Sequence, residues 1–167
     1  NGMLKNSTAL KFTNVFGPNE WHKGDMRSVV CKAYEQISRT GKMQLFKSHR
    51  DGYADGEQKR DFLYVKDAVD MVMYIYKNNL AGIFNIGSGR AETWNSLAEA
   101  IFLAMGIEKN IEYIDMPCEI RDKYQYYSCA DMNKLYASGY DKEPATLKSA
   151  VKNYIVEHLT ASRHLGE

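Results

Sequence analysis

The chain has 167 residues, which is enough for one compact domain with its own core and too few for two domains of ordinary length. Hydrophobic residues make up 44% and charged residues 26%, the balance of a soluble globular protein, and no apolar run approaches the length that spans a bilayer. Lys and Arg total 22 against 21 Asp and Glu, so we expect neither a nucleic-acid nor a membrane partner, and any anion site must be local.

The cysteines and the termini favour a cytoplasmic protein. The three cysteines are an odd number, form no C-x-x-C motif and have no nearby His spacing; they are Cys31, Cys118 and Cys129. We therefore expect neither a disulfide framework nor a metal site. The first three residues carry neither the basic start nor the apolar stretch of a signal peptide. We expect a single domain over residues 8–160, with tails at 1–7 and 161–167.

The N-terminal third predicts a strand, a helix and a second strand. The run TALKFTNVF at residues 8–16 is rich in β-branched, aromatic and aliphatic residues and ends at Gly17-Pro18, which indicates a buried strand with a sharp stop. Residues 26–38 carry apolar side chains at helical spacing, with Asp25 as a candidate N-cap. A short strand at 43–46 leads into a long polar loop at 47–59, and loops of this length are often functional.

The middle of the chain alternates strands with helices. A strand at 62–65 precedes a helix at 67–77, and a strand at 82–86 precedes a helix that Thr93 caps and Gly106 ends. The apolar residues of the first of these helices predict its buried face; they are Val69, Val72, Met73 and Tyr76.

The last third predicts one more strand and two helices. The strand covers 111–114, a short helix begins with the capping box Ser128-x-x-Asp131 and ends at Gly139, and a last helix starts at Thr146. The alternation of strands and helices along the chain predicts an α/β fold with parallel pairing through right-handed crossovers.

Residues 14–26 form the first candidate site, because they follow the C-terminal end of a predicted strand, where open α/β sheets bind ligands. The alternative is a strand-exit loop with solvated His22 and Lys23. A second candidate is the pair Lys59-Arg60, since the planar fork of an arginine suits a diphosphate. Here the alternatives are an exposed charge pair or an internal ion pair between Arg60 and Asp61.

Gly87-Ser88-Gly89 stands between a strand and a helix, as a phosphate-binding loop would. It lacks the third glycine and the following acidic residue of a dinucleotide fingerprint, so a tight structural turn is the better interpretation. The tyrosines at 124, 126 and 127 could stack on a base or sugar, although such clusters more often belong to a core or an interface. No Ser-His-Asp or Cys-His arrangement emerges.

Three segments, LKFTNVFGP, KRDFLYVKDAVDMV and GIFNIGSGRAETWNSLAEAI, resemble in order and spacing the C-terminal half of extended short-chain dehydrogenases that act on nucleotide sugars. The resemblance implies an α/β fold that forms the substrate-binding part of such an enzyme, with remnant strands of a Rossmann-type parallel sheet. Within that family, HKGDMRSVV, YADGEQKRDF, IEYIDMPCEIRDKYQYY and ASGYDK resemble the ADP-glycero-manno-heptose 6-epimerases. Other epimerases or dehydratases acting on UDP or dTDP sugars, and a non-catalytic sugar-nucleotide-binding module, stay open as alternatives.

The resemblance also implies roles for individual residues. The family uses NADP to oxidise the sugar and then to return hydride to the opposite face, with one acid/base group for each face. Lys23 would be one such catalytic group and would lie near the cofactor, and Val15 would touch the nicotinamide end. The substrate ADP-heptose would be bound by Asn14, Asp25, Lys32, Phe46, Lys47, Ser48, His49, Arg60 and Tyr124. A cytoplasmic homo-oligomer in lipopolysaccharide core biosynthesis is the implied setting.

Two family motifs have no counterpart in this sequence. There is no G-x-x-G-x-x-G near the start and no Y-x-x-x-K before the first strand. We therefore expect that this chain alone neither holds NADP tightly nor turns over substrate. The strands at 8–16 and 82–86 would then show unpaired edges, which favours self-association.

Overall fold

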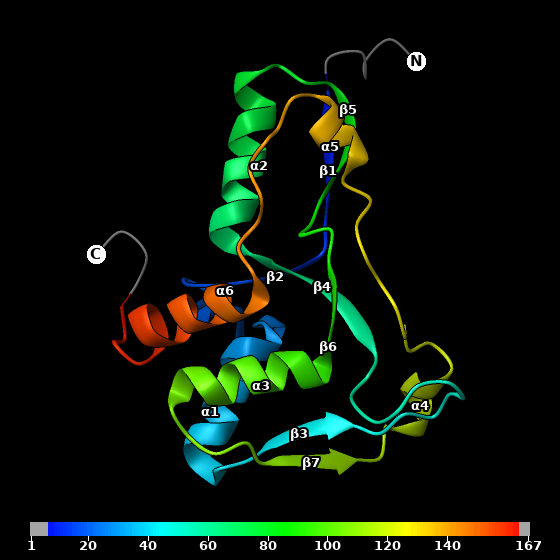
Figure 1. Ribbon diagram of the computed structural model, residues 1–167, viewed down its shortest axis with the longest axis vertical. Helices are drawn as coiled ribbons and strands as arrows, with labels where there is room; N and C mark the ends of the chain where they lie inside the picture. Colours follow the sequence, from blue (N-terminus) through cyan, green and yellow to red (C-terminus); the bar gives the residue numbers. More distant parts are fainter. Residues whose placement is uncertain (1–6, 164–167) are drawn as a thin grey trace.

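The computed structural model describes residues 7–163, and within them the strands form three small sheets flanked by helices (Figure 1). The first sheet pairs β1 (Thr8–Phe12) with β5 (Gly82–Ile86), the second has the order β2 (Asn14–Phe16), β4 (Lys59–Tyr64), β6 (Ala91–Thr93), and the third pairs β3 (Met43–Phe46) with β7 (Ile111–Ile114). These pairs are parallel except for β4 with β6. The α/β class with parallel pairing is confirmed.

The helices alternate with the strands along the chain. They are the 3-10 helix η1 (Trp21–Met26), α1 (Val29–Thr40), α2 (Val65–Lys77), α3 (Trp94–Met105), α4 (Cys118–Arg121), α5 (Asn133–Ala137), α6 (Leu147–Asn153) and the π-helix η2 (Tyr154–Leu159). The predicted cap at Thr93 and the predicted start of a helix at Thr146 are confirmed, since each side chain accepts a hydrogen bond from the backbone three residues on as the N-cap of its helix. Gly106 ends α3 in the left-handed conformation, as predicted. No helix among the described residues is long and apolar enough to cross a membrane.

The strand predicted over residues 8–16 is divided in two at Thr13. The Val15 N–H donates to the Thr13 carbonyl at 3.0 Å, a local turn that redirects the chain, and the Thr13 N–H donates to Ile86 at 3.1 Å. As a result β1 pairs with β5, whereas β2 pairs with β4. The prediction of one continuous strand was wrong because a period-two pattern does not reveal a change of partner. The predicted burial was wrong for β1, whose residues are mostly exposed.

Helix α1 begins three residues later than predicted, and Ser28 rather than Asp25 is its N-cap. The Ser28 hydroxyl accepts a hydrogen bond from the Cys31 N–H at 3.3 Å. The 3-10 helix η1 intervenes, and Gly24 interrupts it with φ 53° and ψ −124°, which no α-helix accommodates. Asp25 lies within η1, one residue after Gly24, and so does not begin α1.

Helix α2 buries a different face from the one predicted. Ala68, Met71 and Ile75 are buried, whereas Val69 and Tyr76 are 54% and 74% exposed. Met73 is 42% exposed and Val72 is half-buried. Both sets of residues follow helical spacing, so periodicity alone did not decide between two adjoining apolar faces.

The capping box predicted at Ser128-x-x-Asp131 is absent. The Ser128 N–H donates to the Lys59 carbonyl at 3.2 Å, which keeps this segment extended beside β4. Asp131 instead accepts from the Asn133 N–H at 2.9 Å, and the N-cap of α5 is Met132. Strand β6 and helix α4 were not predicted at all.

Two hydrophobic clusters lie on either side of strand β4. The lower cluster joins α1, α3, α6 and η2, and the upper cluster joins α2, α5 and the β1–β5 pair (Figure 1). Phe62 and Tyr64 belong to the lower cluster, whereas Leu63 belongs to the upper one. Because successive side chains of a strand point to opposite faces, β4 forms the shared wall between the two clusters.

Candidate functional site

Arg60 is a charged residue that is buried among aromatic rings. It lies in β4, is 8% exposed, and donates from Nη1 to the Lys59 carbonyl at 2.8 Å. Its guanidinium lies 5.1 Å from the ring centre of Tyr124 and 5.8 Å from that of Trp94. These ring contacts stabilise a buried cation without neutralising its charge.

Within residues 7–163 no carboxylate forms an ion pair with Arg60, so the predicted alternative of an Arg60–Asp61 pair is wrong. The Asp61 carboxylate accepts hydrogen bonds from the Ser88 and Gly89 backbone and from Ala130, at 2.7, 3.1 and 2.9 Å. Burial lowers the pKa of Arg60, while Tyr124 acts in the opposite direction. A buried cation without a protein anion fits a site that receives an anionic ligand.

Aromatic side chains surround this cation. Phe46, at the end of β3, meets the Tyr124 ring edge-on at 6.3 Å between ring centres, and Tyr124 meets Tyr126 in the same way at 5.5 Å. Burial raises the pKa of Tyr124, while the Arg60 charge lowers it. The structure therefore brings together three of the predicted substrate residues, Phe46, Arg60 and Tyr124.

The loop after β3 is held by hydrogen bonds from its backbone to two side chains and by one ion pair. The His49 N–H donates to the Tyr126 hydroxyl at 2.9 Å, and the Ser48 N–H donates to Asp55 at 2.7 Å. Lys47 forms an exposed ion pair with Asp115 at 3.4 Å. These contacts fix residues 47–49 beside Tyr126, next to the ring that contacts Tyr124.

The glycine turn at 87–89 is structural, as predicted. The Ser88 N–H and hydroxyl donate to the Asp61 carboxylate at 2.7 Å each, and the Gly89 N–H donates to it as well. A phosphate would have to displace this buried carboxylate. Among the described residues, the turn therefore does not fit the phosphates of a dinucleotide.

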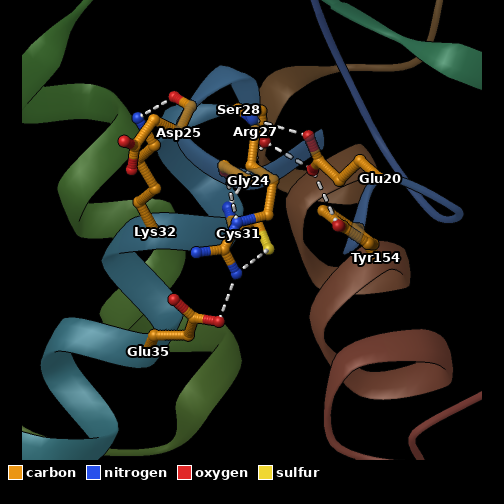
Figure 2. Close-up of polar contacts among 9 residues, drawn as sticks. All are labelled: Glu20, Gly24, Asp25, Arg27, Ser28, Cys31, Lys32, Glu35 and Tyr154. Carbon is orange, nitrogen blue, oxygen red and sulfur yellow. Dashed lines mark hydrogen bonds and ion pairs between the residues drawn. The ribbon is translucent and has the colours of Figure 1, made fainter. Parts of the chain in front are cut away.

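The second group of predicted residues comes from β2, η1 and α1, and Figure 2 shows two of its members, Asp25 and Lys32. Lys23 is exposed and its N–H donates to the Glu20 carbonyl at 3.0 Å. The Lys32 ammonium donates to the Asp25 carbonyl, which places these two residues together. Asn14 is exposed and Val15 half-buried at the start of β2.

The two groups are separate in their contacts. Within residues 7–163, no hydrogen bond, ion pair or ring contact joins Lys23, Asp25 or Lys32 to Arg60, Tyr124 or Phe46. The same part of the chain has no group of His, Cys, Asp and Glu side chains that could hold a metal.

Two residues at these sites were missed in the sequence. Trp94 reaches Arg60 because β6 pairs antiparallel with β4, and this short strand leaves little trace in the sequence. Tyr154 reaches Glu20 across 134 residues of chain, at 2.7 Å. A buried tyrosine late in an amphipathic helix was the one available signal, and it indicates only a core position.

The chain belongs to the NAD dependent epimerase/dehydratase family, whose family model matches residues 5–87. A relative from Nitratidesulfovibrio vulgaris is 49% identical over 162 residues, which are 96% of this chain and 50% of that protein. That protein is named ADP-L-glycero-D-manno-heptose-6-epimerase. The chain thus spans about half the length of the curated relatives that it matches.

Solved structures of the same family share this fold. An ADP-L-glycero-D-manno-heptose-6-epimerase from Helicobacter pylori superimposes with a TM-score of 0.76 at 24% identity, over 92% of this chain and 44% of that one. A UDP-glucose 4-epimerase from Thermus thermophilus in complex with NAD gives 0.71 at 21% identity, over 93% and 47%. At this identity the likeness establishes the fold alone, which is the α/β fold of the family.

Proposed function

We propose that this chain carries the nucleotide-sugar side of an ADP-glycero-manno-heptose 6-epimerase. The observation that supports this proposal most directly is the buried Arg60, which has aromatic contacts and no carboxylate partner among residues 7–163. The family and the name of the N. vulgaris relative support the same reaction class.

Arg60 is proposed to bind the diphosphate. Its donors lie in a poorly hydrated setting, where a hydrogen bond to a charged group is stronger than in water. Phe46 and Tyr124 border the same cation and are proposed to contact the ADP portion. Lys47, Ser48 and His49 form the adjoining loop and are proposed to line that portion of the ligand.

Lys23 is proposed as one of the two acid/base groups of the epimerisation. A reaction that treats both faces of one carbon needs a proton donor or acceptor on each face. The Lys23 amine is exposed on η1, whose backbone is tied to the rest of the domain. Asn14, Asp25 and Lys32 are proposed to face the sugar.

A nicotinamide dinucleotide, which we propose to be NADP, would supply the hydride transfer. The glycine turn at 87–89 provides no cradle for its phosphates, since its N–H groups donate to Asp61. Val15 and Lys23 are proposed to border its nicotinamide end. We further propose that the whole enzyme is a cytoplasmic homo-oligomer.

Calorimetric titration of this chain with ADP-mannose and with UDP-glucose tests the proposal. We expect ADP-mannose to bind more tightly, and Arg60→Ala to weaken that binding about tenfold or more, the effect of losing a charged hydrogen-bonding group. Arg50→Ala is the matched control, because Arg50 also lies over two aromatic rings, at 5.8 Å from Tyr53 and 5.6 Å from Tyr126, but is exposed.

The two alternatives make different predictions in this experiment. Tighter binding of UDP-glucose would assign the chain to an epimerase or dehydratase of another nucleotide sugar. Equal loss of affinity in the Arg60 and Arg50 variants would contradict the role proposed for Arg60.

A further inference from the structure

Glu20, the residue before η1, is a buried carboxylate to which no role has been assigned so far (Figure 2). It is 4% exposed, and its two oxygens accept hydrogen bonds from the Ser28 N–H and hydroxyl at 2.6 Å each and from the Tyr154 hydroxyl at 2.7 Å. Within residues 7–163 no Lys or Arg pairs with it. Neutral donors therefore satisfy this charge, which is costly to bury.

The three donors come from two helices. Ser28 is the N-cap of α1, and Tyr154 is the first residue of η2. Burial, followed by the hydrogen bond to Glu20, raises the pKa of Tyr154, so its hydroxyl stays a neutral donor. Glu20 thus links the start of α1 to the C-terminal helices.

The segment between Glu20 and Ser28 is the one that carries Lys23. At its N-terminal end the Lys23 N–H donates to the Glu20 carbonyl at 3.0 Å. At its C-terminal end Arg27 donates from Nε to the Gly24 carbonyl at 2.8 Å and pairs through Nη1 with Glu35. Both ends of the segment are therefore anchored, and Lys23 lies between the anchors.

Gly24 shows that the path of this segment is determined by its backbone. Its φ of 53° and ψ of −124° are unfavourable for residues with a Cβ, yet an added Cβ would meet nothing within 4 Å. The glycine is therefore required by conformation and not by space. A conformation of this kind persists only where the surroundings hold it.

We propose that Glu20 is a positioning residue, which through Ser28 and Tyr154 fixes the Lys23 segment against helices α1 and η2. This inference rests on the role proposed for Lys23. A misplacement of a reacting group by about 1 Å is enough to cost about a hundredfold in rate, so an anchored segment matters to the reaction.

Amide hydrogen exchange of this chain tests the anchoring independently of activity. In Glu20→Gln and in Tyr154→Phe we expect the Lys23 and Arg27 amides to exchange about tenfold faster or more, because a hydrogen bond to a buried charge is lost. Tyr154→Phe keeps the buried ring and so decides the matter if Glu20→Gln does not fold.

Asp70→Asn is the matched control. Asp70 also accepts a tyrosine hydroxyl, from Tyr140 at 3.0 Å, but lies on α2. We expect it to leave exchange at Lys23 and Arg27 unchanged. Unchanged exchange in folded Glu20→Gln and Tyr154→Phe would overturn the inference, and so would equal acceleration by Asp70→Asn.

Steady-state kinetics of the complete holoenzyme then test positioning against a merely structural role. We expect Glu20→Gln to lower kcat about tenfold or more while KM changes less than about threefold, as for an interaction used in the transition state. Wild-type kcat in Glu20→Gln, with Lys23→Met inactive, would overturn the inference alone. Full activity in Lys23→Met would instead contradict the proposed function. The hydrogen-exchange experiment would still test whether Glu20 anchors the Lys23 segment.

Discussion

The two halves of the molecule differ in how completely they bury their apolar surface. Around the lower cluster, exposed apolar side chains are scattered over different elements, such as Met26 on η1 and Leu103 on α3. On α2, in contrast, Val69, Met73 and Tyr76 form one exposed face at helical spacing. Single exposed apolar residues are ordinary, whereas a contiguous face marks a surface for association. The face formed by Val69, Met73 and Tyr76 therefore marks the upper half as the one with a surface for association.

Asp61 should give the largest effect, because it ties β4 to two segments that are distant in the sequence. Its carboxylate accepts hydrogen bonds from Ser88, Gly89 and Ala130 while fully buried. We expect Asp61→Ala to lower the free energy of unfolding by about 3–5 kcal/mol, as loss of a buried charged network does. Urea denaturation measures this. Asp131→Ala, at an exposed carboxylate, should cost less than about 1 kcal/mol, and equal costs would show that the buried hydrogen bonds of Asp61 add little to stability.

Matched truncations compare the two clusters directly. Ile101 of the lower cluster is 0% exposed and Ile75 of the upper cluster 4%. Loss of a buried Ile side chain costs about 2–5 kcal/mol, more where the surroundings cannot collapse. We expect Ile101→Ala to cost more than Ile75→Ala in the same denaturation experiment. The reverse order would mean that the upper cluster is the more rigidly packed of the two.

Local signals were enough to predict part of this structure. The cap at Thr93, the helix end at Gly106 and the helix start at Thr146 were predicted correctly, because such signals depend on neighbouring residues alone. The division of the strand at Thr13 and the buried face of α2 depend on which distant segment each element packs against, so periodicity did not determine them.

The candidate site was predictable only in pieces. Arg60 and Lys23 were identified from motifs, but a motif does not show whether a cation has a carboxylate partner. The contacts of Trp94 with Arg60 and of Tyr154 with Glu20 join segments far apart in the sequence. They arise from tertiary packing, which leaves no local pattern in one sequence.

The exposed face of α2 predicts self-association, as the unpaired strand edges did from the sequence. We expect the chain to form oligomers that weaken in the double variant Met73→Lys, Tyr76→Glu, since charges on the face would have to be desolvated. The free energy of unfolding should change by less than about 0.5 kcal/mol, the usual range for surface positions. Sedimentation at several concentrations measures the association.

A single charge on the other half is the control for this experiment. Leu103 is 55% exposed on α3, so Leu103→Lys introduces a charge at an exposed apolar position outside the α2 face. It should leave association unchanged. A wild-type chain that stays monomeric and binds no apolar dye would contradict the predicted role of the α2 face.

The smallest expected effect is a pH dependence in the upper half. The hydrogen bond from Lys142, at 2.6 Å, lowers the pKa of Asp70 below its ordinary value of 3.8, and Tyr140 acts in the same direction. A carboxyl whose pKa is lowered by folding contributes stability that is present above its unfolded pKa and is lost as pH falls through the folded value. The wild type should therefore lose more stability than Asp70→Asn as the pH drops below about 4.

The size of that difference discriminates between two ways of holding α2. The Lys142 and Asp70 side chains are 65% and 38% exposed, so screening limits their contribution to less than about 1 kcal/mol. Thermal unfolding at several pH values, repeated at about 1 M salt, where the Debye length is about 3 Å, should show a small difference that shrinks further. A larger, salt-resistant difference would mean that this pair, rather than the burial of Ala68, Met71 and Ile75, holds α2 to the segment at 140–142.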